Sequence, residues 1–204
     1  MTRDAVVHVL PGLGASSAMY AGAWRELPSA RFHDWTSAHG ATELGDAAAA
    51  LVAAAPIAPG DVVVGTSLGG MVACEIAAQV PLGALVLVSS AVHPSEVNRV
   101  LALLHPLARV APVEFAQRAA GKLPAELARM FAEGDATFMR AMCAAVFRWR
   151  GLAPTLPPPF RIHGRADRVI PPPPSPDVLL EGGHLVAISD AARCVAAVRA
   201  HLAV

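Results

Sequence analysis

A serine at a sharp turn is the first residue whose surroundings suggest chemistry. Ser67 lies in the segment GTSLGG (65–70), between an apolar run and a stretch with helical spacing. A nucleophile on a strand-to-helix bend has strained backbone angles and closely packed neighbours, so small residues are needed two positions before and after it. Gly65 and Gly69 occupy those positions. We expect the Ser67 hydroxyl to be exposed at the carboxyl end of a sheet, with the first amides of the following helix directed at a developing negative charge.

A hydroxyl group needs a base to remove its proton, and that base needs a carboxylate to orient it. His184 follows a short apolar run in the segment LLEGGH, and Asp167 follows another in RIHGRADRVIP. Their order along the chain, serine then aspartate then histidine, is one of the orders in which catalytic triads occur. We predict that Ser67 is the nucleophile, His184 the base and Asp167 the acid of one triad.

Motifs at four places resemble those of the α/β-hydrolase superfamily, and the resemblance covers most of the chain. They are LPGLGASS after the first apolar run, GTSLGG at the serine, HGRADRVIP at the aspartate and GGH at the histidine. The resemblance implies an α/β fold, a serine hydrolase activity without a metal, and the same three catalytic residues. It also implies an oxyanion hole made by the backbone amides of Leu13 and Leu68. One departure is Pro11, which stands where such enzymes usually have a histidine in the first loop.

These residues also have plainer explanations. Ser67 could be only a helix cap. Asp167 could be a loop residue paired with Arg165 or Arg168, an arrangement worth little energy at a surface. The segment 89–92, which follows the preceding strand, offers no carboxylate that could act instead of Asp167. The context and order of the three residues favour the triad.

Three further histidines lie in places that invite an assignment. We expect His8 to be a hydrogen-bonded core residue within a buried strand, and His163 to be structural at the end of the strand that precedes the acid. His93 opens a helical segment and is a candidate for lining a pocket. The histidines, cysteines and acidic residues show none of the close paired spacings that zinc sites use, so no metal site is expected.

The elements that must position these residues alternate along the chain. Short apolar runs rich in valine and punctuated by Gly and Pro are typical of buried parallel strands, and longer stretches with apolar residues at i, i+3, i+4 and i+7 indicate helices. This alternation predicts an α/β fold, a three-layer α/β/α sandwich with about six mostly parallel strands. The expected strands are 5–10, 31–35, 61–66, 84–89, 159–163 and 178–181, and the expected helices are 16–27, 43–55, 68–79 and 186–202.

Residues 94–150 interrupt the alternation, because they contain helical patterns but no strand-like run. We predict that they form a helical cap insertion over the carboxyl ends of the strands, within a single domain that comprises residues 1–204. The helices of this cap are expected at 96–105, 113–120, 124–132 and 137–149.

Two features indicate a trimmed member of the superfamily. The residues before Ala5 leave no room for the two strands with which such enzymes usually begin. The prolines of IPPPPSPD (170–177) cannot propagate the helix that usually precedes the last strand. We expect 170–177 to be a short rigid loop without an α-helix.

The composition of the chain limits the kinds of molecule that it is expected to bind. The 204 residues suffice for one domain with a core, and 16 basic residues balance 16 acidic ones. No net field attracts nucleic acid or an anionic membrane, so a small-molecule acyl substrate is expected. No apolar run reaches the ~20 residues that cross a bilayer, and the first residues lack the features of a signal peptide, so we expect a cytoplasmic protein. Cys74, Cys143 and Cys194 are expected to be reduced and buried. No cofactor is expected, and the oligomeric state is left open.

The predicted activity is hydrolysis of a small acyl ester or thioester through an acyl-enzyme intermediate. An acyltransferase or a carbon–carbon bond hydrolase would use the same triad, and a non-catalytic ligand-binding protein would share the fold. A nicotinamide enzyme is another alternative, because Gly12-Leu13-Gly14 follows a strand and Asp34 ends the next one. However, Ser17 stands where that fingerprint requires a third glycine. The segment 60–67 has the glycine spacing of a phosphate loop, but Thr66 stands where lysine is needed.

Overall fold

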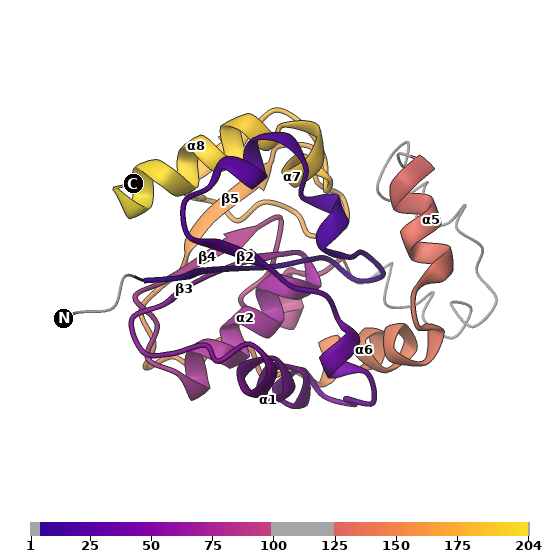
Figure 1. The fold of residues 1–204 in the computed structure, drawn as a ribbon. Helices are drawn as coiled ribbons and strands as arrows, with labels where there is room; N and C mark the ends of the chain where they lie inside the picture. Colours follow the sequence, from indigo (N-terminus) through magenta and orange to yellow (C-terminus); the bar gives the residue numbers. More distant parts are fainter. Residues whose placement is uncertain (1–4, 99–124, 204) are drawn as a thin grey trace.

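A computed structural model describes residues 5–98 and 125–203 of the chain. At its centre is a six-stranded sheet in the order β2-β1-β3-β4-β5-β6, and every neighbouring pair of strands is parallel (Figure 1). The predicted parallel sheet is therefore confirmed. Its strands are β1 (Val7–Leu10), β2 (Ala30–Phe32), β3 (Val62–Thr66), β4 (Ala84–Val88), β5 (Phe160–Gly164) and β6 (Val178–Leu180).

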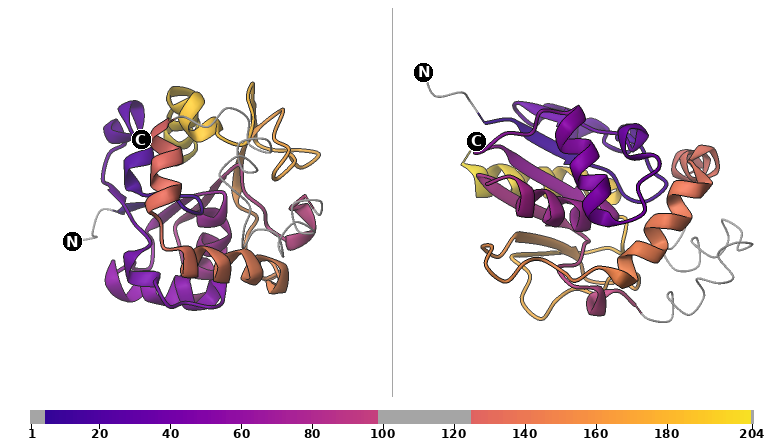
Figure 2. Two further views of the ribbon diagram at one scale, coloured as in Figure 1. Left: turned by 90° about the vertical axis from the view of Figure 1, so that its right-hand side faces the viewer. Right: turned by 90° about the horizontal axis from the view of Figure 1, so that it is seen from below.

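Helices cover both faces of the sheet, as the predicted three-layer sandwich requires. The views in Figure 1 and Figure 2 place α1 (Leu44–Ala54) and α2 (Leu68–Gln79) on one face. The opposite face carries α7 (Val186–Ser189), α8 (Ala191–Leu202) and the 3₁₀ helix η2 (Gly22–Glu26).

Side chains of the central strands alternate between two hydrophobic cores, one on each face. Leu10, Val63 and Leu87 enter the core beneath α1 and α2. Val64 and Val86 enter the core on the side of α8. A strand buried on both faces has no polar side to show in its sequence, so it appears as a continuous apolar run. This is why β3 and β4 could be recognised from the sequence.

The helix predicted over 16–27 is wrong. The chain instead forms two short 3₁₀ helices, η1 (Ser17–Met19) and η2. Gly22, the first residue of η2, has φ +55°, a left-handed conformation that an α-helix does not contain. The apolar residues that suggested helical spacing are nevertheless buried, including Tyr20 and Trp24, whose rings pack edge to face.

The terminal helix predicted over 186–202 is interrupted. Asp190 has φ −136° and ψ 48° and separates α7 from α8. Aspartate favours the ends of helices over their interiors because its side chain competes for nearby backbone groups. The break lets the chain turn after α7 before α8 packs along the sheet.

Two α-helices and the 3₁₀ helix η4 (Pro94–Glu96) lie in the described part of the predicted cap. The two α-helices are α5 (Ala125–Glu133) and α6 (Ala136–Arg148), in agreement with the helices predicted at 124–132 and 137–149. Asp135 caps α6, because its Oδ1 accepts hydrogen bonds from the amides of Thr137 and Phe138 at 2.8 and 2.9 Å. The segments predicted as helices at 96–105 and 113–120 fall mainly outside the described residues. The division into one domain with a cap insertion stays a prediction.

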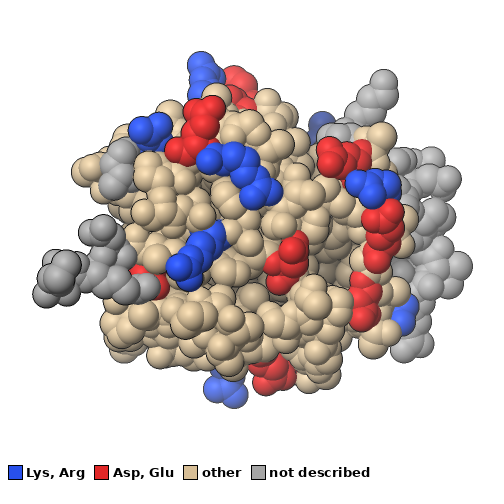
Figure 3. Space-filling model, viewed as in Figure 1, with Lys and Arg blue, Asp and Glu red and all other residues tan. Residues whose placement is uncertain are grey.

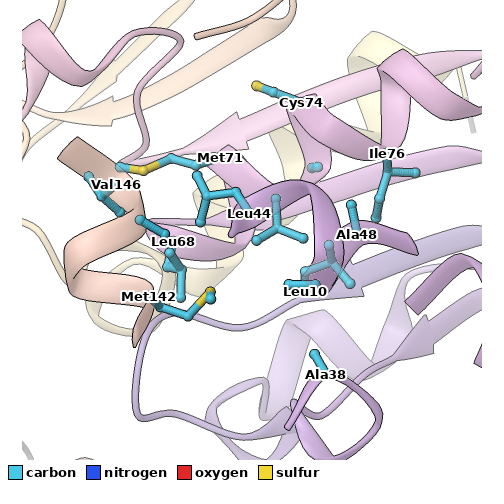
Figure 4. Close-up of a cluster of buried hydrophobic side chains, with 14 of the residues drawn as sticks. Leu10, Ala38, Leu44, Ala48, Leu68, Met71, Cys74, Ile76, Met142 and Val146 are labelled. Carbon is cyan, nitrogen blue, oxygen red and sulfur yellow. The ribbon is translucent and has the colours of Figure 1, made fainter. Parts of the chain in front are cut away.

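The α6 helix packs against the start of α2. Met142 and Val146 of α6 point toward Leu68 and Met71 of α2 in the buried cluster shown in Figure 4. Because α2 begins directly after β3, this contact brings α6 to the carboxyl end of the sheet.

The connection from β5 to β6 contains no α-helix over residues 170–177, as predicted. Asp177 ends this loop, and its Oδ2 accepts a hydrogen bond from the amide of Arg161 at 2.7 Å.

Acidic and basic side chains are interspersed on the face of the molecule shown in Figure 3. This distribution agrees with the balanced composition. Among the described residues, no helix is long and apolar enough to cross a membrane.

Candidate active site

Ser67 occupies a strained turn between β3 and α2. Its φ of 54° and ψ of −120° lie in a region that residues with a side chain rarely adopt. Two backbone hydrogen bonds hold the turn: the Ser67 amide donates to the Val88 carbonyl, and the Gly70 amide donates to the Ser67 carbonyl, each at 3.0 Å. The hydroxyl of Ser90, two residues after the end of β4, also donates to the Ser67 carbonyl at 2.6 Å. The turn is thus fixed from both sides.

The glycines around Ser67 permit close packing that a side chain would prevent. A Cβ atom at Gly65 would lie 2.5 Å from the Cα of Gly70, and one at Gly69 would lie 2.6 Å from the carbonyl oxygen of Leu10. Gly70 has the same constraint, because a Cβ there would lie 2.5 Å from the Cβ of Ser90. The spacing of Gly65 and Gly69 is evident in the sequence, but the contact between Gly70 and Ser90 is not, because it joins α2 to the segment after β4.

His184 reaches Ser67 from the loop after β6. Its Nε2 lies 2.9 Å from the Ser67 Oγ. The loop approaches closely because Gly164, at the end of β5, has no side chain: a Cβ there would lie 2.9 Å from the Gly182 carbonyl oxygen. Gly182 itself has φ +139°, a conformation that favours glycine. The Gly-Gly pair before the histidine therefore lets the backbone take the course that brings His184 to Ser67.

Asp167 is buried behind His184 and has both carboxylate oxygens occupied. Its Oδ2 lies 2.9 Å from the His184 Nδ1. Its Oδ1 accepts hydrogen bonds from the amides of Val169 and Ile170 at 2.9 and 3.0 Å. An ionised carboxylate only accepts hydrogen bonds, so the His184 Nδ1 must carry the proton and its Nε2 is free to accept the Ser67 hydroxyl proton. The structure thus brings together the three residues that the sequence placed in one triad.

The two amides predicted to form an oxyanion hole lie beside Ser67. Leu68 is the first residue of α2, and Leu13 lies in the loop after β1. Within residues 5–98 and 125–203, neither amide donates to a backbone or side-chain acceptor. Both residues line the same cavity as Ser67. A helix N-terminus also carries partial positive charge, so this position favours an anion.

Tyr20 links the loop after β1 to the Ser67 turn, a role that the sequence did not reveal. Its hydroxyl is fully buried and donates to the Leu10 carbonyl at 2.6 Å. It also shares a hydrogen bond of 2.8 Å with the hydroxyl of Thr66. Burial raises the pKa of the Tyr20 phenol, so it stays protonated. The indole of Trp35 adds support, because its Nε1 donates to the Gly12 carbonyl at 2.9 Å.

His163 supports the acid and not the nucleophile. It is fully buried, and its Nε2 donates to the Ile170 carbonyl at 2.9 Å. Burial lowers the pKa of His163, which favours the neutral ring. Since Ile170 also donates its amide to Asp167, His163 holds the turn that carries the acid. This agrees with the structural role expected of it.

His8 and His93 lie away from Ser67. His8 is buried in β1, with its Nε2 3.2 Å from Asp61 Oδ2 and its Nδ1 2.9 Å from His33 Nε2. It is a hydrogen-bonded core residue, as expected. His93 lines a different cavity, of about 620 Å³, beside the proline-rich segment before β5. Among the described residues, His93 does not line the cavity at Ser67, so a place for it in the substrate pocket stays a prediction.

An apolar cavity of about 180 Å³ opens at Ser67. Its walls come from the loop after β1, the first turn of α2, α6 and the loops after β4 and β5, through Leu13, Ser67, Leu68, Met71, Val97, Met142, Cys143, Val146, Phe147, Val169 and Ile170. Ser67 is itself among the residues that line this cavity.

The described residues give no sign of a metal centre. Among them, no group of three or more histidine, cysteine or acidic residues is placed to hold a metal ion. Cys74, Cys143 and Cys194 are free thiols; Cys74 and Cys194 are buried and Cys143 is partly buried. Burial raises the pKa of the Cys74 and Cys194 thiols to about 12.

The loop after β1 is unsuited to a dinucleotide. It leads into the 3₁₀ helix η1, whereas the fingerprint requires an α-helix whose N-terminus receives the pyrophosphate. The carboxylate of Asp34 accepts a hydrogen bond from the Ser17 amide at 2.6 Å. Asp34 therefore holds the end of this loop instead of facing a ribose.

Comparisons with known proteins support the α/β fold described above. The sequence matches the model of the alpha/beta hydrolase family over residues 4–197. It matches none of the curated proteins with which it was compared.

Several solved structures share the fold at low sequence identity. A thermophilic esterase from Thermogutta terrifontis has a TM-score of 0.73 at 19% identity, over 98% of this chain and 89% of the esterase. A hydrolase from Oleispira antarctica has a TM-score of 0.73 at 14% identity, over 94% of this chain and 88% of that one. An N-acyl homoserine lactonase has a TM-score of 0.73 at 18% identity, over 97% of this chain and 88% of the lactonase.

Proposed function

Because the chain belongs to the alpha/beta hydrolase family, we propose that it is a serine hydrolase that cleaves a small acyl ester or thioester. One observation carries the proposal: an unbroken chain of hydrogen bonds from Ser67 Oγ to His184 Nε2 and from His184 Nδ1 to Asp167 Oδ2, each 2.9 Å long. This arrangement activates a hydroxyl group as a nucleophile. A plain helix cap at Ser67, or an ion pair of Asp167 with Arg165 or Arg168, would require neither contact.

The first half of the reaction forms an acyl-enzyme. The Ser67 Oγ attacks the acyl carbonyl carbon while His184 Nε2 takes the hydroxyl proton, and a tetrahedral intermediate forms. His184 then gives that proton to the departing oxygen or sulfur as the bond to the acyl carbon breaks. Asp167 holds the imidazole in the required tautomer and stabilises the imidazolium while it carries both protons.

The second half of the reaction releases the acid. Water gives a proton to His184 Nε2 and attacks the acyl carbon, and the bond to Ser67 Oγ breaks as the proton returns to the serine. In both halves the negative oxygen accepts hydrogen bonds from the amides of Leu13 and Leu68. Loss of one such donor typically costs about 10²–10³ in rate.

The test is hydrolysis of a panel of acyl esters, thioesters and lactones. Ser67→Ala and His184→Ala should each remove nearly all turnover, and the double variant should be hardly worse, because members of a triad act as a unit. Ser37→Ala, at an exposed serine, is the matched control and should keep native activity. A chelator should leave the rate unchanged. The proposal is wrong if Ser67→Ala keeps native turnover on every substrate that the native protein cleaves.

Two related activities share these steps. An acyltransferase would use another acceptor in place of water, and a carbon–carbon bond hydrolase would use a different leaving group. Product analysis with added alcohols separates transfer from hydrolysis. A non-catalytic ligand-binding protein would not need the complete set of Ser67, His184 and Asp167. The cytoplasmic location stays a prediction.

A further inference from the structure

Apart from Ser67 and Cys143, the described residues that line the cavity at Ser67 are apolar. The cavity has a volume of about 180 Å³ and receives side chains such as Met71 of α2 and Met142, Val146 and Phe147 of α6. Among the described residues that line it, none carries a charged side chain. Burying a charge without a partner is costly, so the cavity suits a neutral apolar group.

The position of the cavity identifies which side of an ester it receives. Leu13, Ser67 and Leu68, which surround the reacting carbonyl in the proposed mechanism, all line it, whereas His184 does not. His184 must reach the leaving oxygen or sulfur to protonate it. The leaving group therefore lies on the His184 side, and the cavity receives the acyl chain.

The volume limits the length of that chain. A protein cavity of about 150 Å³ can hold one benzene molecule, which has six carbons. A cavity of about 180 Å³ accordingly holds an unbranched chain of about six carbons. Met142 and Val146 line this cavity from the α6 side, and their side chains face Leu68 and Met71 of α2 (Figure 4).

We infer that the substrate is an ester or thioester of a short unbranched fatty acid, and that Val146 helps to set the upper limit of acyl chain length. This inference rests on the proposed function, because it assigns the acyl side of the same reaction.

The direct test compares two series of esters with the native protein. In the first the acyl chain grows from acetyl to decanoyl with a fixed alcohol, and in the second the alcohol grows with a fixed acyl group. Burial of one methylene corresponds to about a fourfold gain, so kcat/KM should rise by up to about fourfold per acyl carbon to about hexanoyl and then fall. The alcohol series should be much flatter. A flat acyl series, or a stronger dependence on the alcohol, would overturn the inference.

Substitution of Val146 tests its role. Val146→Ala should move the optimum by about one or two carbons to longer chains, and Val146→Phe should move it to shorter ones, because they enlarge and fill the cavity. Val52→Ala removes the same methyl groups from α1, outside the cavity, and should leave the profile unchanged. An optimum that stays in place in both Val146 variants would show that Val146 does not set the limit.

Binding without turnover separates this inference from the proposed mechanism. In Ser67→Ala protein labelled at the methionine methyl groups, 1-hexanol should shift the NMR signals of Met71 and Met142, which line the cavity. The signals of Met19 and Met130, in the other core, should not move. Failure of Ser67 chemistry with retained binding would refute the mechanism alone, and absence of selective shifts would refute the cavity assignment.

Discussion

Removal of the Tyr20 hydroxyl should disturb stability and catalysis together. Tyr20 contacts the Leu10 carbonyl and the Thr66 hydroxyl at 2.6 and 2.8 Å. Leu10 precedes the loop that carries the Leu13 amide, and Thr66 precedes Ser67. The phenol therefore ties the two segments whose amides would bind the oxyanion. Tyr20→Phe keeps the ring and deletes only this tie.

The cost follows from the burial of the groups that lose their partner. A buried polar group left without its hydrogen bond destabilises a protein by about 1–3 kcal/mol. For a chain of this size each kcal/mol lowers Tm by about 2–4 °C, so Tyr20→Phe should melt about 2–12 °C below the native protein. Since a full oxyanion donor is worth about 10²–10³ in rate, displacement of one without its loss should lower kcat by less, about tenfold.

Thermal denaturation and steady-state kinetics measure the two effects. Thr66→Val removes the other partner, and the double variant with Tyr20→Phe completes a cycle. The two changes should be non-additive, since they delete one shared contact. A Tyr20→Phe protein that melts within about 1 °C of native and keeps native kcat would refute the link between the two segments.

Three further predictions concern other parts of the structure. His163→Gln keeps a donor for the Ile170 carbonyl and should retain most activity. His163→Met is similar in size to Gln but has no donor, so it should lower kcat about tenfold with little change in KM and displace the acid limb of the kcat–pH profile. Equal pH profiles for both variants would contradict the role of His163 in holding the turn of the acid. The pKa of His33 is lowered to about 4 by burial and by His8, so the unfolded chain binds more protons than the native state between about pH 4 and 6.5. The free energy of unfolding should therefore fall as pH drops through that window. Urea titrations at pH 5 and 7.5 should show that this free energy falls less in His33→Gln than in the native protein. An equal fall in both proteins would refute the contribution of His33. Gly69→Ala places a Cβ 2.6 Å from the Leu10 carbonyl oxygen and should greatly reduce Tm and activity. The control is Gly45→Ala, whose Cβ would face only a side-chain oxygen at 3.3 Å in a helix, and its Tm should equal or exceed that of the native protein. Similar Tm values for the two variants would count against the close packing at Gly69.

The parts predicted from the sequence are those whose causes are local. The strands β3 and β4 were evident because burial on both faces leaves only apolar residues. The Ser67 turn was evident because its glycines lie two positions away on the chain. The 3₁₀ helices at 17–26 were not, because buried residues with similar spacing occur in both kinds of helix and the left-handed Gly22 is set by the surrounding packing.

The supporting contacts at the candidate site could not be predicted because they join residues far apart in the sequence. Tyr20 bonds to Thr66, 46 positions away, and Ser90 bonds to Ser67, 23 positions away. Nothing in the composition of either segment signals its partner. Only the order and register of the strands bring them together.

The order of the strands also separates the proposed catalytic groups between a firmly held and a loosely held part of the molecule. The nucleophile follows β3, which has a paired strand on each side, whereas the base follows β6, a three-residue strand at the edge of the sheet. Proteins open locally where few contacts hold an element, without global unfolding. Fraying of β6 would withdraw His184 and take Leu180 out of the core on the α8 side, while the other buried residues of the two cores lie outside β6. The lifetime of activity therefore depends on this edge more than on total stability. The prolines of 171–174 limit the conformations open to the frayed segment, and so favour its return to the sheet.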